Sequence, residues 1–360
     1  MPAESVGAFA PGRVNLIGEH TDYNGGLALP FAIAEGITVS AEALGGGDTA
    51  HDGSRIEARA LDLDERDAFD IGEPWPNGGW RAFVRGTAGE LQNQGWTFPS
   101  ATLEIGGDLP RGAGLSSSAA LEVALALALL ELAREPRPPH PDAIALATLC
   151  SRVENDWVGA RTGLLDQLAS LCGEAEHAVL IDFRTLEMEP VPLRLEAWRL
   201  VVLDSGERHD VASSGYNDRR VECARACELL GIEYLSEANT GALGDLPETL
   251  RKRALHVLEE DARVRTAASA LRRGDLAPLG ELLNASHRSL RDQYEVSTPA
   301  LDAAAARLRE CGAAGARMIG GGFGGSVLGL FGPGSRPPPE AREVQPSAGA
   351  HVLESETRRT

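Results

Sequence analysis

The 360-residue sequence has a single lysine, Lys252, so that 33 of its 34 basic side chains are arginines. Because no Gly-Lys-Ser or Gly-Lys-Thr occurs, the lysine-dependent phosphate loop of the P-loop proteins is excluded. A phosphate-binding site in this chain must therefore rely on backbone amides, hydroxyl groups, arginine and a metal ion.

Negative charge outweighs positive charge, and the net value is −19. This argues against nucleic acid as a partner, since its phosphates need a basic surface. It does not exclude a nucleotide, because ATP arrives with magnesium and is held by local groups.

Aromatic residues make up only 5% of the chain, so its cores must be built mainly from Ala, Leu and Val. No stretch approaches eighteen uncharged apolar residues, and the best candidate, residues 119–133, contains Glu122 and Glu131. The sequence does not begin with a basic segment and an apolar run, the pattern of a signal peptide. Five scattered cysteines without metal-ligand pairing indicate free thiols. We therefore expect a cytoplasmic protein with no membrane partner.

The chain is long enough for two domains. Apolar alternation predicts strands over residues 56–69, 101–105, 178–183, 200–203 and 327–331, and Asn24-Gly25 between apolar runs is a hairpin signal. Helical spacing predicts helices over 121–134, 143–157, 164–171, 219–230, 247–271, 276–294 and 299–311, the first apolar nearly all round and so buried. This order indicates an α+β fold in two lobes. We expect domains over 1–195 and 196–335, then a short Pro-rich tail over 336–360, with little structure after Gly332.

Six consecutive polar side chains, residues 19–24, stand between two of the apolar runs. A hairpin turn alone needs only the Asn-Gly. Carboxylates and an imidazole packed so densely suit a ligand with many hydroxyl groups, because one carboxylate accepts from two adjacent hydroxyls. A solvated surface loop is the alternative.

A second cluster, residues 109–120, places Gly112 and Gly114 before three serines and the predicted buried helix. The start of a helix presents unpaired N–H groups at the positive end of its dipole, which suits an anion. One serine acting as an ordinary N-cap is the alternative, although a cap needs only one of the three.

Two carboxylates and a glycine loop complete the candidate set. Asp166 lies among leucines, where a carboxylate is costly unless it is paired, functional or a helix cap. Glu154 flanks the apolar stripe of the helix expected over 143–157. The glycine-rich segment 320–325 allows close approach to a ligand, but such loops are more often simple bends.

In this order and spacing, the polar cluster, the serine cluster and the glycine loop resemble the three motifs of the GHMP small-molecule kinases. The segment GRVNLIGEHTDYNGG, residues 12–26, resembles the signature of the galactokinase branch nearly residue for residue. The resemblance extends over about residues 8–331 and includes the segments 153–159, 165–167 and 213–220. It implies a ribosomal-protein-S5-like N-terminal domain, a ferredoxin-like C-terminal domain, and ATP-dependent phosphorylation of α-D-galactose at its 1-hydroxyl.

The resemblance also implies a role for each matching residue. Asp166 is the expected base, with Arg13 as its partner at the transferring phosphoryl group. Mg²⁺ is expected on Ser118 and Glu154. The remaining expected contacts are Glu19, His20, Thr21, Asp22, Gly163 and Tyr216 for the sugar, and Trp80, Gly112, Ala113, Gly114, Leu115, Ser116, Ser117 and Ser118 for ATP.

The expected partners are thus galactose and ATP, and the expected state is a monomer or weak homodimer. Two other functions fit the same motifs. One is a related kinase of N-acetylgalactosamine or arabinose. The other is a non-catalytic regulator that senses galactose and ATP, which the intact segment 116–120 disfavours.

Overall fold

The computed structural model of the chain describes residues 5–44, 54–73, 77–110, 112, 114–134, 137–160, 162–207 and 215–354. Of the predicted ATP loop, Ala113 lies outside these residues, as do the first two positions of the motif 213–220.

The N-terminal half is organised around a six-stranded sheet in the order β13-β1-β3-β6-β4-β5. Only β4 and β6 run parallel; the other neighbours are antiparallel. Polar and apolar residues alternate in β4, so that Ile56, Ala58 and Ala60 are buried on one face. The strands are β1 (Ser5–Asn15), β3 (Pro30–Ala43), β4 (Arg55–Ala60), β5 (Glu65–Asp70), β6 (Ala101–Gly107) and β13 (His351–Leu353), and the 3-10 turn η2 (Leu61–Leu63) joins β4 to β5.

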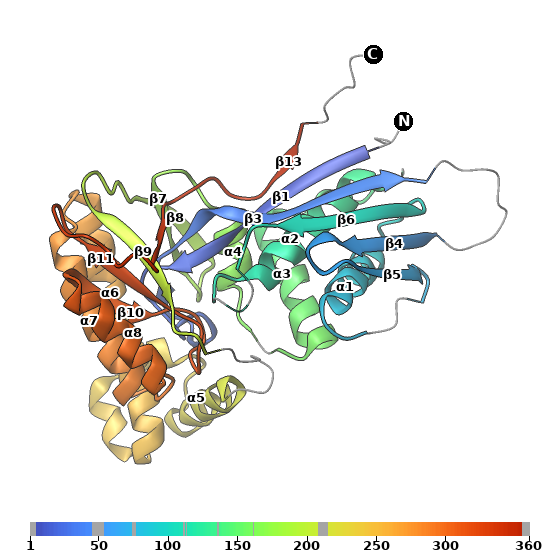
Figure 1. Ribbon diagram of the computed structural model, residues 1–360. Helices are drawn as coiled ribbons and strands as arrows, with labels where there is room; N and C mark the ends of the chain where they lie inside the picture. The colour runs from blue at the N-terminus through green and yellow to red at the C-terminus, as the bar shows by residue number, and fades with distance from the viewer. Residues whose placement is uncertain are drawn as a thin grey trace.

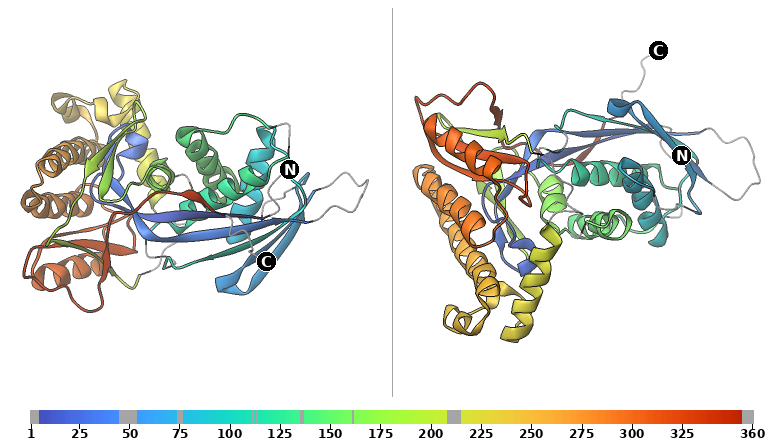
Figure 2. Two further views of the ribbon diagram at one scale, coloured as in Figure 1. Left: turned by 90° about the horizontal axis from the view of Figure 1, so that it is seen from above. Right: turned by 60° about the horizontal axis from the view of Figure 1, so that its bottom comes forward.

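Four helices lie together against one face of this sheet (Figures 1 and 2). They are α1 (Trp80–Asn93), α2 (Ser117–Leu132), α3 (Ala143–Arg152) and α4 (Leu165–Leu171). The central one, α2, contacts β1 and β3 on one side and the other three helices on the rest. Residues 119–126 of α2 are all buried, as its apolar character predicts. It begins at Ser117 rather than at residue 121, because the serines form its first turn.

The C-terminal half places helices on a four-stranded sheet in the order β10-β11-β9-β12. Its helices α6, α7 and α8 stack at the side of the molecule opposite to α1 (Figure 1). The elements are β9 (Arg199–Asp204), α5 (Tyr216–Leu230), η4 (Leu235–Glu237), η5 (Thr240–Asp245), α6 (Glu248–Arg272), α7 (Ala277–Asp292), α8 (Pro299–Glu310), β10 (Ala313–Met318), β11 (Ser326–Phe331) and β12 (Arg342–Val344).

A small third sheet joins the halves, with β2 (Leu27–Ala28), β7 (His177–Asp182) and β8 (Glu187–Pro192) side by side. The strand β2 pairs with β7, and α6 also contacts both β2 and β8. The segment after β1 is therefore held from both halves of the chain.

The connection between β1 and β3 differs from the predicted Asn-Gly hairpin. The last pair of the two strands is Asn15 with Pro30, and the residues between them form a wide loop that contains the 3-10 turn η1 (Asp22–Asn24). The Asn24 amide donates to the His20 carbonyl at 2.7 Å, so this side chain folds the loop on itself and makes no two-residue turn.

Residues 333–354 contain two paired strands, and the expectation of little structure after Gly332 is wrong for this described part. The strand β12 pairs with β9, and β13 pairs antiparallel with β1, beside which it lies in Figure 1. Backbone pairing with existing sheet edges orders a segment that has few apolar side chains. Between the strands, three amides donate to the body of the protein, namely Ser347 N to Ala32 O (2.8 Å), Gly349 N to Gly173 O (2.7 Å) and Ala350 N to Ser170 O (2.8 Å).

None of the helices in the described ranges combines the length and apolar character that crossing a membrane requires.

Ending the chain after Pro346 is expected to destabilise the folded protein by about 2–4 kcal/mol, because these three backbone hydrogen bonds and the β1–β13 pairing are lost. Thermal unfolding followed by calorimetry measures this. The matched control ends after Glu354 and keeps both features. Equal unfolding temperatures for the two truncated chains would show that the last strand contributes nothing.

Candidate active site

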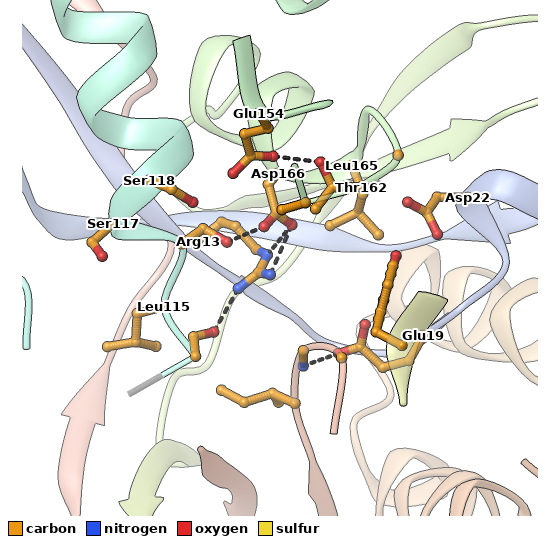
Figure 3. Close-up of a pocket in the computed structure, with 18 of the residues that line it drawn as sticks. Arg13, Glu19, Asp22, Leu115, Ser117, Ser118, Glu154, Thr162, Leu165 and Asp166 are labelled. Carbon is orange, nitrogen blue, oxygen red and sulfur yellow. Dashed lines mark hydrogen bonds and ion pairs between the residues drawn. The ribbon is translucent and has the colours of Figure 1, made fainter. Parts of the chain in front are cut away.

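A cavity of about 370 Å³ opens where the loop after β1, the start of α2, the turn after α3 and the loop after β10 meet (Figure 3). Most of the predicted site residues line it, namely Arg13, Glu19, His20, Asp22, Gly112, Gly114, Leu115, Ser116, Ser117, Ser118, Glu154, Gly163, Asp166 and Tyr216. The four sequence clusters therefore meet in one place.

At the centre of the cavity, Arg13 and Asp166 form an ion pair. The Arg13 Nε and Nη2 atoms each lie 2.7 Å from Asp166 Oδ1, and Nη1 donates to the Gly114 carbonyl at 2.7 Å. The Ser116 hydroxyl donates to the other carboxylate oxygen, Asp166 Oδ2. One arginine from β1 thus orients both the carboxylate on α4 and the loop before α2, as Figure 3 shows.

The serine cluster forms the start of α2. Ser116 is the N-cap residue, but its backbone is left-handed (φ 58°, ψ 52°) and its side chain does not cap the helix. The alternative of an ordinary serine cap is therefore wrong, since the hydroxyl is committed to Asp166. A strained conformation costs about 1–3 kcal/mol and is commonly found at functional sites. Ser117 and Ser118 follow in the first turn and face the cavity (Figure 3).

Glu154 lies in a feature that the sequence did not indicate. The helix expected over 143–157 ends as an α-helix at Arg152 and continues as a π-helical turn, η3 (Val153–Val158). Such wide turns often occur at functional sites. Here Glu154 accepts from the Thr162 hydroxyl and, at 3.1 Å, from the Gln167 amide, and it lies within hydrogen-bonding reach of Ser118.

The opposite end of the cavity is formed by the polar loop after β1. Asp22 lines this end and lies across the cavity from Ser117 (Figure 3). A Cβ atom on Gly163 would lie 1.8 Å from Asp22 Oδ2, so only glycine leaves room for the carboxylate. His20 and Tyr216 lie beside it with ring centroids 5.4 Å apart.

Glu19 joins the polar loop to the C-terminal half. Its Oε1 accepts from Gly320 N at 2.8 Å and pairs with Arg317 at 3.0 Å, while Oε2 accepts from Asn15 at 3.0 Å. Arg317 is fully buried and also donates to two carbonyls of residues 15–16. The glycine loop, which looked like a simple bend, is thereby fixed against the polar cluster.

Two residues of the predicted site, Thr21 and Trp80, do not line the cavity. The Thr21 hydroxyl is directed at the carbonyls of Gly18 (2.9 Å) and Leu27 (2.8 Å). The Trp80 indole donates to Glu65 at 2.8 Å, and one turn later Phe83 lines the cavity instead. Phe83 and Thr162 line the cavity but were not predicted, because neither stands in a polar or glycine-rich cluster.

Carboxylates dominate the electrostatics of the cavity. Burial, and then the charge of Asp166, raise the pKa of Asp22 to about 7. Burial also raises the pKa of Glu154 and, well above its ordinary value, that of Glu122, to which Gln167 donates as well. Among the described lining residues, Arg13 is the only arginine. A divalent cation would offset this excess of negative charge.

Comparison with known proteins supplies the family. The chain matches three family models. They are the galactokinase galactose-binding signature over residues 2–43, the GHMP kinases N-terminal domain over 82–174 and the GHMP kinases C-terminal family over 267–351. A galactokinase of Thermotoga petrophila is 41% identical over 320 residues, which cover 89% of this chain and 87% of that protein. The chain belongs to the galactokinase family. Its reaction is accordingly an ATP-dependent phosphoryl transfer.

Other galactokinases support this assignment. That of Roseiflexus sp. is 41% identical over 332 residues, covering 89% of this chain and 82% of its own. The crystal structure of Lactococcus lactis galactokinase complexed with galactose superimposes with a TM-score of 0.86 at 32% identity, over 97% of this chain and 95% of that one. A mevalonate kinase of Methanococcus jannaschii (TM-score 0.63, 17% identity) shares the fold alone. The predicted α+β GHMP kinase fold is confirmed.

The raised pKa of Asp22 has a measurable consequence for stability. A carboxyl whose folded pKa (about 7) exceeds its ordinary value (3.8) favours the folded state when protonated, so wild type loses stability as pH rises between about 4 and 7. Asp22→Asn removes this half-buried charge and is expected to be more stable than wild type by roughly 2–4 kcal/mol at pH 8. Denaturant titrations at pH 4 and pH 8 test this, and a difference that does not grow with pH would contradict it.

Proposed function

We propose that this cavity binds galactose and ATP together and transfers the γ-phosphoryl group to the 1-hydroxyl of the sugar, with Asp166 and Arg13 at the point of transfer. The observation that carries the proposal is the Arg13–Asp166 pair, which stands where the polar loop and the start of α2 meet. Phosphoryl transfer asks a protein mainly for positioning and charge stabilisation, and this junction offers both.

The sugar subsite is the end of the cavity that contains His20, Asp22, Gly163 and Tyr216. Its carboxylate, imidazole and phenol are suited to hydroxyl groups, and Gly163 lets the chain pass close to the sugar. Glu19 contributes by holding the loop, since both of its oxygens already have protein partners. Thr21 acts in the same way through its bonds to backbone carbonyls.

The phosphates of ATP lie against the start of α2. Its unpaired N–H groups and the hydroxyls of Ser117 and Ser118 supply donors to an anion without any lysine. The nucleotide base extends toward α1, where Phe83 lines the cavity. Trp80, one turn earlier, borders that subsite from outside.

Ser118 and Glu154 would hold Mg²⁺, and the structure provides a fitting donor set. A carboxylate and a hydroxyl are ligands that Mg²⁺ prefers, and few protein ligands suffice because the ion keeps waters and phosphate oxygens. The raised pKa of Glu154, caused first by burial, indicates a site in which a cation would be stabilising. When bound, the ion would neutralise charge on the phosphate oxygens.

Asp166 accepts the proton of the 1-hydroxyl as this oxygen attacks phosphorus. Arg13 orients the carboxylate through two nitrogens and, with Ser116, fixes its plane. Its guanidinium also faces the charge that develops on the transferred group, an effect worth several kcal/mol in a dry site.

The enzyme acts in the cytoplasm as a monomer or weak homodimer. All five cysteines are free, which suits a reducing compartment. The signature over residues 2–43 favours galactose over the related sugars.

Asp166→Asn is expected to lower kcat by about 10²–10⁴, because the amide keeps the shape of the carboxylate but accepts no proton. Single-turnover transfer measures the rate, and calorimetry measures galactose binding, which should change little. Asp156→Asn, an exposed change in the nearby π-helical turn, is the matched control. Retention of more than about a tenth of the wild-type rate with normal sugar binding would remove Asp166 from the role of base.

Glu154→Gln is expected to raise the Mg²⁺ concentration for half-maximal rate at least about tenfold, because a charged ligand becomes neutral. The measurement is the initial rate against free Mg²⁺ at saturating galactose and ATP. An unchanged Mg²⁺ dependence, with Asp156→Asn as control, would show that the ion is held elsewhere.

A further inference from the structure

His20 occupies an unusual position in the proposed sugar subsite. Its backbone is left-handed (φ 63°), a conformation that costs a non-glycine residue free energy, and the Asn24 amide holds its carbonyl at 2.7 Å. The side chain is buried and lines the cavity. Its Nε2 atom is buried without a well-formed hydrogen bond to a described residue, although the Gly321 backbone lies near the ring, whereas Nδ1 lies 2.8 Å from the Tyr23 hydroxyl. A buried polar atom of this kind is expected to bind a ligand group.

The Tyr23 hydroxyl begins a chain of polar groups that leads into the C-terminal half. It lies 2.9 Å from the Tyr294 hydroxyl, which lies 3.0 Å from the Cys223 sulfur. Tyr294 is fully buried just after α7, and Cys223 is buried in α5. The ring of Tyr294 also packs on that of His20, with centroids 4.6 Å apart.

His20 is neutral in this setting. Burial lowers the pKa of His20 well below its ordinary value, and the electrostatic effects of His256 and Arg219 lower it further. The Gly321 backbone raises this pKa, but its effect is smaller than that of burial. In a neutral imidazole one ring nitrogen carries the proton and the other accepts. The direction of the Nδ1–Tyr23 hydrogen bond, which the groups beyond Tyr23 can set, therefore decides which role remains for Nε2.

Packing alone does not require these hydroxyls. Phenylalanine rings would fill the same space, and each buried hydroxyl costs free energy unless it is hydrogen-bonded. Tyr23 is held from its other side by the Arg220 guanidinium, 5.0 Å from the ring centroid, a contact that phenylalanine would also make. The hydroxyls of Tyr23 and Tyr294 therefore contribute hydrogen bonds that the packing of the rings does not explain.

We propose that Tyr23 and Tyr294 are positioning residues that lock the orientation and tautomer of His20, so that Nε2 meets a hydroxyl of the sugar. Tyr23 acts directly on the imidazole, and Tyr294 acts through Tyr23. Because Tyr294 belongs to the C-terminal half, sugar recognition by the N-terminal loop depends on contact between the halves. The inference rests on the proposed function, in which His20 binds galactose.

Tyr23→Phe and Tyr294→Phe test it, because each removes one oxygen and keeps the ring. Tyr23→Phe is expected to raise the KM for galactose roughly five- to tenfold, the effect of one lost buried hydrogen bond, and Tyr294→Phe somewhat less. The KM for ATP and kcat should change less than twofold. The matched control is Tyr234→Phe, which removes a hydroxyl outside this chain of groups. An unchanged galactose KM in Tyr23→Phe would overturn the proposal.

A double-mutant cycle with His20→Ala separates positioning from general stability. In the His20→Ala background, Tyr23→Phe should raise the dissociation constant for galactose, measured by calorimetry, by less than twofold. The same several-fold rise as in wild type would mean that Tyr23 does not act through His20.

Nitrogen-15 NMR gives an independent readout, since the His20 ring should show one tautomer in wild type and an average of two in Tyr23→Phe. An average of two tautomers in the wild-type protein would contradict the positioning role of Tyr23. If the wild-type protein did not phosphorylate galactose, that result would instead contradict the proposed function.

Discussion

The ion pair between Arg13 and Asp166 joins positions 153 residues apart and is the contact around which the cavity is assembled. Arg13 comes from a sheet strand and Asp166 from a short helix, and the same guanidinium holds the loop that leads into α2. A partly buried pair of this kind is expensive to break, because removing one partner leaves the other charge without compensation. The strand β1, the helix α4 and the loop before α2 are therefore held in one geometry.

The cavity is otherwise assembled at a cost in stability. Ser116 and His20 adopt left-handed backbones. The half-buried Asp22 and the buried Glu154 and Glu122 are carboxylates with raised pKa values, in each case first through burial. The apolar body that surrounds them compensates, since α2 is buried along most of its length and packs on two strands and three helices. The fold thus uses a dry, rigid helix to hold a strained and highly charged site.

Much of this arrangement could be predicted from the sequence. Helical periodicity located α6, α7 and α8 to within a few residues, because long amphipathic patterns are strong signals, and the clustering of glycines, serines and carboxylates pointed to most of the cavity. The strands β8, β10, β12 and β13 were missed. Of these, β12 and β13 are three residues long and pair with the distant strands β9 and β1, so no local pattern reveals them. The π-helical turn at Glu154 was also not predicted, nor was the lining of the cavity by Phe83 in place of Trp80. Side-chain direction at a helix start is decided by tertiary contacts, such as the Trp80–Glu65 hydrogen bond, that local patterns do not contain.

The pairing of β13 with β1 also matters for the order in which the chain folds. Strand β1 is made well before β13, so the ladder between Gly7 and Leu353 cannot form until residue 353 has left the ribosome. Until then the N-terminal sheet has an open edge with unpaired amides and carbonyls, to which another nascent chain can bind. Completion of this sheet thereby waits until residues 351–353 have been made, and a polypeptide that stops before them keeps the exposed edge.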